Sequence, residues 1–202
     1  MTLVEDIVIK RLGRVEYSFT WEAMRAFTRA RNESTPDEFW LLEHPPVYTV
    51  GQGVSPQAVP GAIPVLKTDR GGDITYHGPG QVVIYTLVDL ARRSIKVKRF
   101  VWLLEQAVID LLHPLDAGRT PGAPGVYVDG AKIAALGIRV VRGRAYHGLA
   151  LNVAMDLSPF AAIDPCGYPG LRVTQMKDLG FKDTADATAG RLADLLVRSL
   201  DA

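Results

Sequence analysis

Apolar residues recur along this chain at two spacings, one typical of helices and one typical of strands. Helical spacing, with apolar residues every three or four positions, covers residues 15–31, 100–112 and 184–200. The apolar face of the first segment would consist of Val15, Phe19, Met24 and Phe27. We therefore expect amphipathic helices at these three places.

Strands are predicted where apolar residues alternate with polar ones or form short continuous runs. These segments are residues 3–10, 37–42, 47–50, 82–88, 131–141 and 147–153. Residues 82–88 are apolar, aromatic or β-branched throughout, which is typical of a central strand covered on both faces. Asp129 and Gly130 are expected to form the tight turn of a hairpin, and residues 118–125, which contain two prolines, a loop.

The order of these elements predicts an α+β fold. Several hairpins and few β-α-β units favour a single domain with a mixed, largely antiparallel sheet flanked by helices. At 202 residues the chain is long enough for one continuous core, and no linker-like segment divides it. We therefore expect one domain spanning residues 1–202.

Composition narrows the class of protein. The hydrophobic and charged fractions, 48% and 22%, are those of an ordinary globular protein, and no apolar run approaches the ~18 residues of a membrane span. No secretory leader pattern is recognisable and the single cysteine, Cys166, agrees with a reducing compartment, so the expected location is cytoplasmic. A net charge of +1 gives no reason to expect nucleic acid as a partner.

Two clusters of basic residues stand out against this nearly neutral balance. One consists of Arg92, Arg93, Lys96, Lys98 and Arg99, and the other of Arg139, Arg142 and Arg144. Such clusters are most often solvated surface, but they are also suited to steering an acidic partner into place.

A glycine-rich stretch, RGGDITYHGPGQ at residues 70–81, lies between two extended apolar segments. Glycine lets a backbone approach a ligand closely, since it lacks a Cβ and tolerates positive φ. We interpret Gly71 and Gly72 as a ligand-facing bend, flanked by the cation of Arg70 and the imidazole of His77. The alternative is a hairpin whose turns happen to be rich in glycine.

Cys166 lies in a turn-forming segment, DPCGYPG. A free cysteine is most often a small apolar residue that fills a gap, but a thiol in a loop is also a candidate nucleophile. A reactive thiolate needs a nearby cation or base, for which Lys132, His77 and His147 are candidates. A metal site built from the histidines and Cys166 is not supported, because no pair of them has the spacing of zinc ligands. Motifs of serine hydrolases, phosphate-binding loops and dinucleotide folds are absent from the sequence.

Four motifs together resemble those of a known enzyme family. RGGDITYHGPGQ, GVYVDGAKIAALGIRV, HGLALNV and DPCGYPG occur in this order over most of the chain, and they are similar to motifs of the octanoyltransferases of lipoate biosynthesis. The resemblance implies the α+β fold shared with biotin and lipoate protein ligases. It also implies that Cys166 accepts the acyl group and that Lys132 is its catalytic partner.

The substrate-contacting segments of that family correspond to three parts of this chain. They are Arg70, Gly71, Gly72, Asp73, Ile74, Thr75, Tyr76 and His77; Ala135, Leu136 and Gly137; and Gly148, Leu149 and Ala150. Asp73 and Asp164 differ from the Gln and Asn that are common in the family, and neither change removes a catalytic group. Backbone N–H groups of Gly71, Gly72 and Gly148 are candidates for stabilising an oxyanion.

The reaction that the resemblance implies is the transfer of an octanoyl group from octanoyl-acyl carrier protein to a lysine of lipoyl domains, through a thioester on Cys166. The implied acceptors are the lipoyl domains of 2-oxoacid dehydrogenase E2 subunits and the glycine cleavage H protein. No cofactor, metal, nucleic acid or membrane is implied. Two alternatives remain: an ATP-dependent lipoate or biotin protein ligase, which would need a nucleotide-phosphate loop, and a non-catalytic fatty-acyl binding protein.

Overall fold

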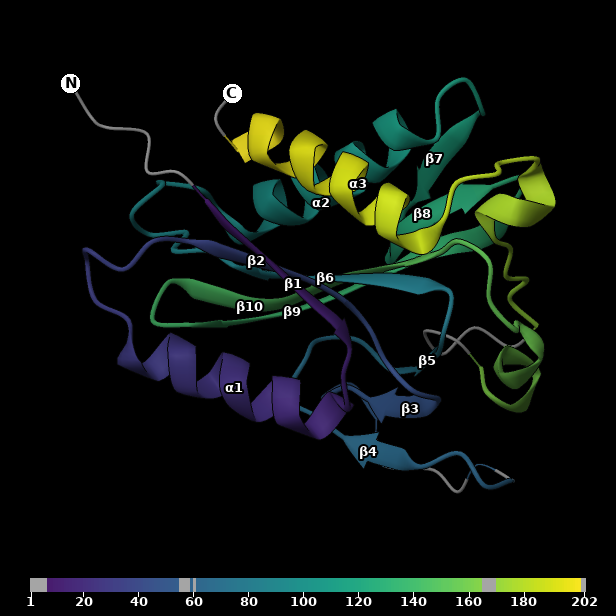
Figure 1. Cartoon of the computed structure of the whole chain (residues 1–202), viewed down its shortest axis with the longest axis horizontal. Helices are drawn as coiled ribbons and strands as arrows, with labels where there is room; N and C mark the ends of the chain where they lie inside the picture. The colour runs from purple at the N-terminus through teal and green to yellow at the C-terminus, as the bar shows by residue number, and fades with distance from the viewer. Residues whose placement is uncertain (1–6, 55–58, 60, 165–169, 201–202) are drawn as a thin grey trace.

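The computed structural model of this protein describes residues 7–54, 59, 61–164 and 170–200. Its main element is a seven-stranded sheet in the order β1-β2-β6-β10-β9-β8-β7, shown in Figure 1. The strands are β1 (Val8–Arg14), β2 (Glu38–Glu43), β6 (Gln81–Leu87), β7 (Ala117–Thr120), β8 (Ala123–Val128), β9 (Ala131–Val141) and β10 (Arg144–Asn152). β1 and β2 run parallel and the other neighbouring pairs are antiparallel, so the predicted mixed, largely antiparallel sheet is confirmed.

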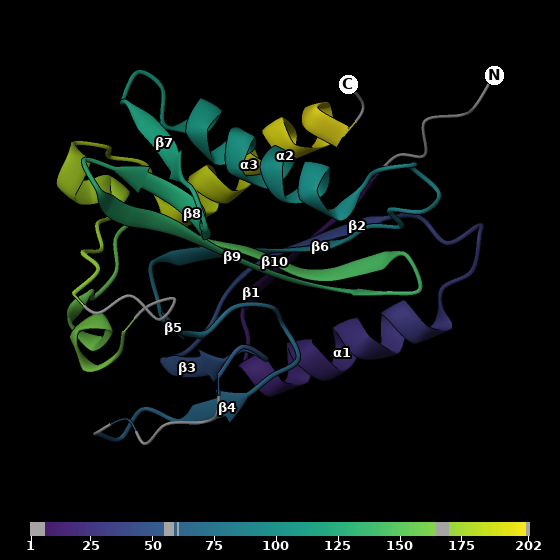
Figure 2. The same cartoon turned by 180° about the vertical axis from the view of Figure 1, so that it is seen from behind.

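Helices cover both faces of this sheet. α2 (Val97–Leu111) and α3 (Ala185–Leu200) lie on one face, and α1 (Tyr17–Ala30) lies on the other, as Figures 1 and 2 show. A three-stranded sheet lies on the same side as α1 and consists of β4 (Val65–Lys67), β3 (Val47–Val50) and β5 (Ile74–His77). Short 3-10 helices, Ser158–Ala162 and Met176–Leu179, follow β10. The α+β fold is confirmed, although the sequence did not indicate that three short strands would form a sheet of their own.

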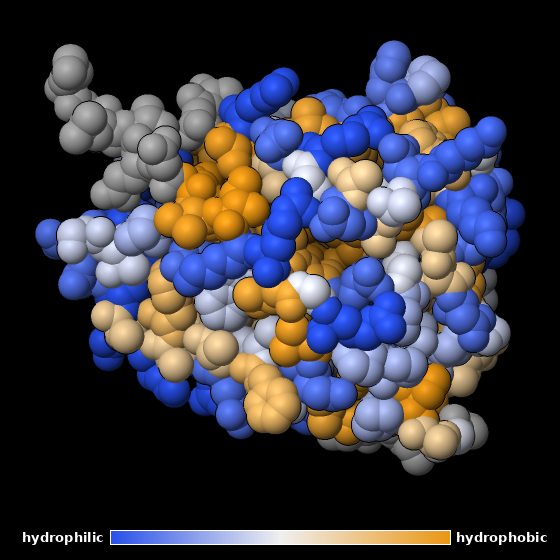
Figure 3. All heavy atoms as spheres, in the orientation of Figure 1, coloured by the Kyte–Doolittle hydropathy of each residue, from blue (hydrophilic) through white to orange (hydrophobic). Residues whose placement is uncertain are grey.

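Two apolar clusters of the core lie on opposite sides of β6. Val82 and Ile84 point into the cluster formed with α2 and α3. Val83 and Tyr85, the alternate residues, point into the cluster formed with α1, where they meet Met24. β6 is fully buried and lies between β2 and β10, so the prediction of a central strand covered on both faces is confirmed. On the face that Figure 3 shows, polar and apolar side chains are intermixed.

The hairpin predicted around Asp129 and Gly130 is also confirmed. Both residues have positive φ, 49° and 73°, which is the backbone of a two-residue turn that matches the twist of its strands. The turn joins β8 to β9 and sets their register, which places Lys132 just after the turn at the start of β9.

The buried face of α1 differs from the predicted one. Tyr17, Thr20, Met24 and Thr28 are buried, whereas Phe19 is 66% exposed. Thr20 tolerates burial because its hydroxyl donates to the backbone carbonyl of Tyr17 at 3.0 Å. The Tyr17 hydroxyl reaches a polar cluster beneath the helix. Of the predicted face, Met24 is buried and Phe27 packs against the same cluster, but hydrophobicity alone did not identify the threonines and the tyrosine that this helix also buries because it covers polar groups.

Two predicted boundaries were also wrong. The first strand runs from Val8 to Arg14 instead of residues 3–10, of which residues 3–6 lie outside the described residues. Most of β1 is exposed, so no apolar alternation marks its second half. The predicted loop at residues 118–125 contains most of a hairpin formed by β7 and β8. Pro124 fits there because it lies outside the registered pairs of both neighbouring ladders, where its missing N–H breaks no ladder bond.

Candidate active site

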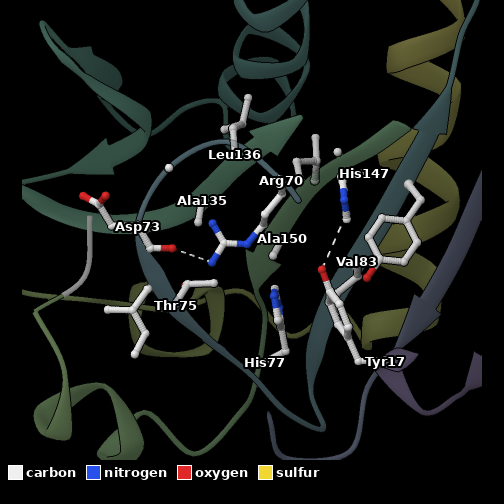
Figure 4. A pocket seen from close by; sticks show the side chains of 16 residues that line it. Tyr17, Arg70, Asp73, Thr75, His77, Val83, Ala135, Leu136, His147 and Ala150 are labelled. Atoms are coloured by element: carbon white, nitrogen blue, oxygen red, sulfur yellow. Dashed lines mark hydrogen bonds between the residues drawn. The ribbon is translucent and has the colours of Figure 1, made fainter. Parts of the chain in front are cut away.

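A cavity of about 40 Å³ lies between β5 and the centre of the β9–β10 hairpin, as seen in Figure 4. It is lined by Tyr17, Arg70, Gly72, Asp73, Ile74, Thr75, His77, Val83, Tyr85, Ala135, Leu136, Gly137, His147, Gly148, Leu149 and Ala150. The three segments that sequence resemblance singled out therefore meet here, although Gly71 and Tyr76 are not among the lining residues. Sequence reasoning missed Tyr17, Val83 and Tyr85 because α1 and β6 carry no recognisable motif.

The wall formed by β9 and β10 includes small residues set opposite one another. Ala135 pairs with Ala150 and Gly137 pairs with Gly148 across the antiparallel ladder. A Cβ at Gly148 would lie 2.1 Å from the Ile84 carbonyl oxygen, so only glycine lets β10 approach β6 this closely. Small side chains at these positions leave open the space that forms the cavity.

The bend at Gly71 and Gly72 packs directly on β9. The Gly71 N–H donates to the Ile138 carbonyl at 3.0 Å, and a Cβ at Gly137 would lie 2.9 Å from the Gly71 carbonyl oxygen. Gly72 has φ of +80°, a conformation that favours glycine. The glycines of this bend therefore serve a close approach between two backbones.

The Arg70 side chain stabilises the bend at Gly71 and Gly72. Its side chain is buried, and its guanidinium donates to the Gly71 carbonyl at 2.9 Å, the Asp73 carbonyl at 2.7 Å, and the carbonyl and hydroxyl of Thr49. Figure 4 shows the guanidinium between the bend and His77. A planar group with five donors is suited to joining two loops in this way.

The candidate oxyanion donors differ in how their N–H groups are placed. The Gly71 N–H is engaged by Ile138, and Gly148 lies inside the ladder, opposite both Tyr85 and Gly137. Among the described residues, no acceptor contacts the Gly72 N–H. Gly72 also lines the cavity, so of the three it is the one that remains a candidate oxyanion donor.

His77 lies in a chain of hydrogen bonds that crosses the site. The Thr49 hydroxyl contacts its Nε2 at 3.3 Å, and its Nδ1 contacts the Gln81 side-chain carbonyl at 2.7 Å. Gln81 donates to Asn152 at 2.9 Å, and Asn152 donates to the Thr174 carbonyl at 3.0 Å. Burial lowers the pKa of His77 to about 3, so the ring is neutral at pH 7.

His147 forms a second polar group, on the other side of Tyr17. Its Nε2 contacts the Asp69 carboxylate at 2.8 Å, so this nitrogen carries the proton and Nδ1 accepts from the Tyr17 hydroxyl at 3.5 Å. Burial lowers the pKa of His147, although Asp69 opposes that shift. Burial also works against the charge of Asp69, but hydrogen bonds from His147, Tyr146 and Trp21 outweigh it and hold the pKa of Asp69 below its usual range. His147 has φ of 61°, an uncommon conformation that a tightly constrained site can hold.

Lys132 lies at the far end of the site from Tyr17. It is only 3% exposed, and its Nζ donates to the Pro124 carbonyl at 3.1 Å and lies 5.2 Å from the centre of the Tyr127 ring. A small second cavity contains Lys132 together with Thr75 and Ala135, which also line the main cavity. A lysine predicted just after a hairpin turn is therefore buried beside the cavity, with its charge directed at protein groups.

The backbone of Lys132 pairs with a segment near the end of the chain. Its N–H donates to the Arg172 carbonyl at 2.8 Å, and its carbonyl accepts from the Thr174 N–H at 2.9 Å. Arg172 follows Cys166 by six positions in sequence. Cys166 itself lies outside the described residues.

The first two arginines of the first basic cluster, Arg92 and Arg93, form ion pairs with another part of the protein. Arg92 and Arg93 contact Asp37 at 2.8 and 2.6 Å, and Arg31 contacts the same buried carboxylate at 2.6 Å. These contacts tie the segment after β6 to the start of β2. Describing Arg92 and Arg93 as solvated surface was wrong, because their partner lies at residue 37 and cannot be recognised from local sequence.

The second basic cluster extends onto α1. Arg139, Arg142 and Arg144 line a hollow of about 470 Å³ together with Arg25 and Arg29 from α1. The floor of this hollow includes Asp69 and Tyr146, whose hydrogen bond of 2.6 Å connects it with His147 of the main cavity.

Metal-binding clusters and membrane-spanning helices are both absent from the part of the chain that the structure describes. Within it, no group of three His, Cys, Asp or Glu side chains is close enough to hold a metal ion. In the same residues, no helix has the length and apolar character needed to cross a bilayer.

Comparison with known proteins assigns the fold and the family. The family model described as the lipoyl protein ligase A/B catalytic domain matches residues 16–196. Two solved structures share the fold: a bipartite lipoate protein ligase from Thermoplasma acidophilum, with a TM-score of 0.79, 16% identity and coverage of 97% of this chain and 84% of that one, and a biotin protein ligase from Aquifex aeolicus, with a TM-score of 0.63, 10% identity and coverage of 96% and 70%.

A sequence relative is much more similar than these structures. The octanoyltransferase of Aromatoleum aromaticum is 59% identical over 198 residues, which are 96% of this chain and 86% of that protein. The octanoyltransferase of Thiobacillus denitrificans is also 59% identical, over 199 residues, with coverage of 96% and 91%. The family model matches most of the chain, and these relatives are 59% identical to it. The chain therefore belongs to the octanoyltransferases, which are acyltransferases of the lipoyl protein ligase A/B family.

Proposed function

We propose that residues 1–202 act as one catalytic domain that transfers an octanoyl group from octanoyl-acyl carrier protein to a lysine of lipoyl domains. Cys166 is the acyl acceptor and Lys132 its partner. The observation that carries this proposal is the place of Lys132, which is buried beside the cavity and pairs through its backbone with the segment that follows Cys166 in sequence. A buried cation is what a cysteine needs in order to react as a thiolate.

The chemistry consists of two acyl transfers. In the first, the Cys166 thiolate attacks the thioester carbonyl, the carbon–sulfur bond to the carrier breaks, and the departing thiolate takes a proton from the Lys132 ammonium. In the second, the amine of the acceptor lysine attacks the Cys166 thioester and gives its proton to the Lys132 amine, while the cysteine leaves as a thiolate. The Gly72 N–H is the proposed donor to the oxyanion in both steps.

The acyl chain would occupy the cavity between β5 and the β9–β10 hairpin. Ala135, Leu136, Leu149 and Ala150 supply apolar walls, and burying each methylene contributes roughly 0.8 kcal/mol. At about 40 Å³, the cavity has room for only a few waters at ~10–15 Å³ each, so an eight-carbon chain requires the walls to part. The half-buried Leu136, which also lines a neighbouring hollow, is the wall residue best placed to move.

Intact-protein mass spectrometry tests the acyl intermediate. Incubation with octanoyl-acyl carrier protein is expected to add one octanoyl group to the wild-type chain and none to Cys166→Ser. Carrier protein without an acyl group provides the control. An adduct of the same yield in Cys166→Ser would refute the assignment.

The same experiment separates the other two functions. A ligase would need ATP and free octanoate to form its product, whereas a fatty-acyl binding protein would take up octanoate reversibly without a covalent adduct. We expect adduct formation without ATP.

We further propose that the lipoyl domains of 2-oxoacid dehydrogenases and the glycine cleavage H protein are the acceptors. Support comes from the family alone, so a direct assay is needed. Each purified acceptor domain, incubated with the octanoyl adduct, is expected to gain one octanoyl group at its lipoyl lysine, and a Lys→Arg acceptor none.

The arginine-lined hollow is the proposed docking surface for the acidic carrier. Arg29 and Arg142 are exposed at its rim, on α1 and at the β9–β10 turn, where they face solvent. Reversing both to Glu should raise the KM for octanoyl-acyl carrier protein several-fold and leave the KM for a small octanoyl thioester unchanged, with the difference shrinking at high salt. Lys182→Glu, an exposed change elsewhere, is the control. Equal effects on both donors would contradict docking at this surface.

A further inference from the structure

Glu105 is a buried carboxylate on a helix face that otherwise packs into the core. It lies on α2 and is 7% exposed, beside buried Leu104 and Val108. Its Oε1 accepts from the Gly125 N–H at 3.0 Å, and its Oε2 accepts from the Arg119 Nε at 2.9 Å. Burying a carboxylate is costly unless its oxygens are paired, so both contacts are needed to hold it there.

The Gly125 N–H belongs to the same peptide group as the carbonyl that binds Lys132. That peptide joins Pro124 to Gly125: its N–H donates to Glu105, and its oxygen accepts from Lys132 Nζ at 3.1 Å. A negative charge at the N–H end polarises the peptide and makes its oxygen a stronger acceptor. A carboxylate on α2 and an ammonium on β9 are thus linked through one peptide plane.

The local backbone leaves room for this arrangement. Gly125 has φ of +144°, and a Cβ there would lie 2.7 Å from Lys132 Cε and 3.2 Å from Nζ. The Lys132 side chain therefore passes over the α-carbon of Gly125 to reach the Pro124 carbonyl. A register shift between Val126 and Tyr127 sets Tyr127 opposite Lys132, where its ring adds a second group that favours the cation.

We propose that Glu105 is a positioning residue that acts through the Pro124–Gly125 peptide to hold Lys132 Nζ in place as an ammonium. This rests on the proposed role of Lys132. Arg119 is the outer member of the arrangement, since it partly neutralises Glu105 and also donates to Gln106 at 2.9 Å and lies 4.8 Å from the Trp102 ring.

Lysine NMR tests the proposal without depending on catalysis. Protein labelled with ¹³C at lysine Cε would be titrated, with the Lys132 signal assigned by its loss in Lys132→Arg. Glu105→Gln keeps an oxygen acceptor for the Gly125 N–H but removes the charge, so the midpoint of the Lys132 titration should move to lower pH by half a unit or more. Glu38→Gln is the matched control, because Glu38, on β2, is 6% exposed and paired with Lys10 of β1.

A second variant has the opposite expected sign. Arg119→Gln removes the counter-charge from Glu105 and leaves the peptide contacts in place, so the Lys132 midpoint should move to higher pH. This variant also decides the question if Glu105→Gln fails to fold. Midpoints that match the wild type in every folded variant would overturn the proposal.

Kinetics supply the complementary readout. Glu105→Gln is expected to lower kcat about tenfold with little change in KM, as when a charge-assisted hydrogen bond becomes neutral. Should Cys166→Ser keep its adduct while the NMR midpoints move as described, the proposed function fails and the role of Glu105 stands. Should the adduct depend on Cys166 while the midpoints stay fixed, the role of Glu105 fails and the proposed function stands.

Discussion

The two ends of the cavity bury ionisable groups in opposite ways. At the Tyr17 end, burial lowers the pKa of His44 to about 4 and that of His77 to about 3, and both ring nitrogens of each contact polar partners. At the other end, Lys132 Nζ contacts a carbonyl oxygen and lies over an aromatic ring, which are groups that favour a cation. The histidines are therefore neutral at pH 7 and hydrogen-bonded at both nitrogens, whereas Lys132 contacts groups that interact favourably with a cation.

This difference bears on which group serves Cys166. A histidine that is neutral at pH 7, with both nitrogens engaged, is a weak base and supplies no charge to favour a thiolate. Lys132 Nζ instead contacts a carbonyl oxygen and an aromatic ring. This difference supports the proposal that Lys132, and not His77 or His147, is the partner of Cys166.

The largest expected effect follows from removing the Lys132 side chain. Lys132→Ala should slow formation of the octanoyl adduct by about 10²–10⁴, the usual range for loss of a general acid or base. The rate is measured by quenched-flow mass spectrometry with octanoyl-acyl carrier protein. Lys177→Ala, which removes an exposed lysine, serves as control. If adduct formation in Lys132→Ala were within a few-fold of the wild-type rate, the proposed difference between Lys132 and the buried histidines would be contradicted.

Lys132→Arg sharpens the same comparison. Guanidinium keeps the charge that favours the thiolate but does not readily give up a proton. The pH dependence of Cys166 alkylation should therefore move to higher pH in Lys132→Ala and partly return in Lys132→Arg. Octanoyl transfer should stay slow in both variants. If the pH dependence of alkylation were the same in Lys132→Ala as in the wild type, the proposed electrostatic role of Lys132 would be wrong.

A smaller effect is expected from His77, on stability instead of rate. Since its folded pKa is about 3 and the unfolded value is near 6.5, the unfolded state binds more protons between these limits. Stability should fall as pH drops below ~6.5, by up to ~1.4 kcal/mol per pH unit for this residue. When the free energy of unfolding is measured in urea at pH 7, 6 and 5, it should fall less with decreasing pH in His77→Gln than in the wild type. His113→Gln, at an exposed histidine, is the control.

The smallest effect concerns the Tyr17 hydroxyl. Its contact with His147 is 3.5 Å long, so Tyr17→Phe should cost no more than ~1 kcal/mol of unfolding free energy. Tyr48→Phe removes a 2.8 Å bond to the Pro159 carbonyl and should cost more. If Tyr17→Phe proved the more damaging of the two in urea unfolding, the Tyr17 end would be held more tightly than its distances indicate.

Local patterns predicted the parts of the fold that depend on neighbouring residues. The Asp129–Gly130 turn needs positive φ at both positions, and the all-apolar run of β6 needs cover on both faces, so each could be recognised in isolation. The second half of the exposed edge strand β1 and the short strand β7 could not, since neither has an apolar pattern of its own.

The candidate site was predictable in its segments but not in its contacts. Motif resemblance singled out Arg70–His77 and the central parts of β9 and β10, and register then set these segments side by side. Tyr17 and Tyr85 line the cavity without any motif, because their role depends on where α1 and β6 cross it.

Residue types at short spacing were enough to define the order of the elements, the central strand, the β8–β9 turn and the family. Packing in three dimensions established which face of α1 is buried, that Arg92 and Arg93 bind Asp37, and that Glu105 meets Lys132 through a peptide. Each of these contacts depends on partners distant in sequence, whose approach no local pattern encodes.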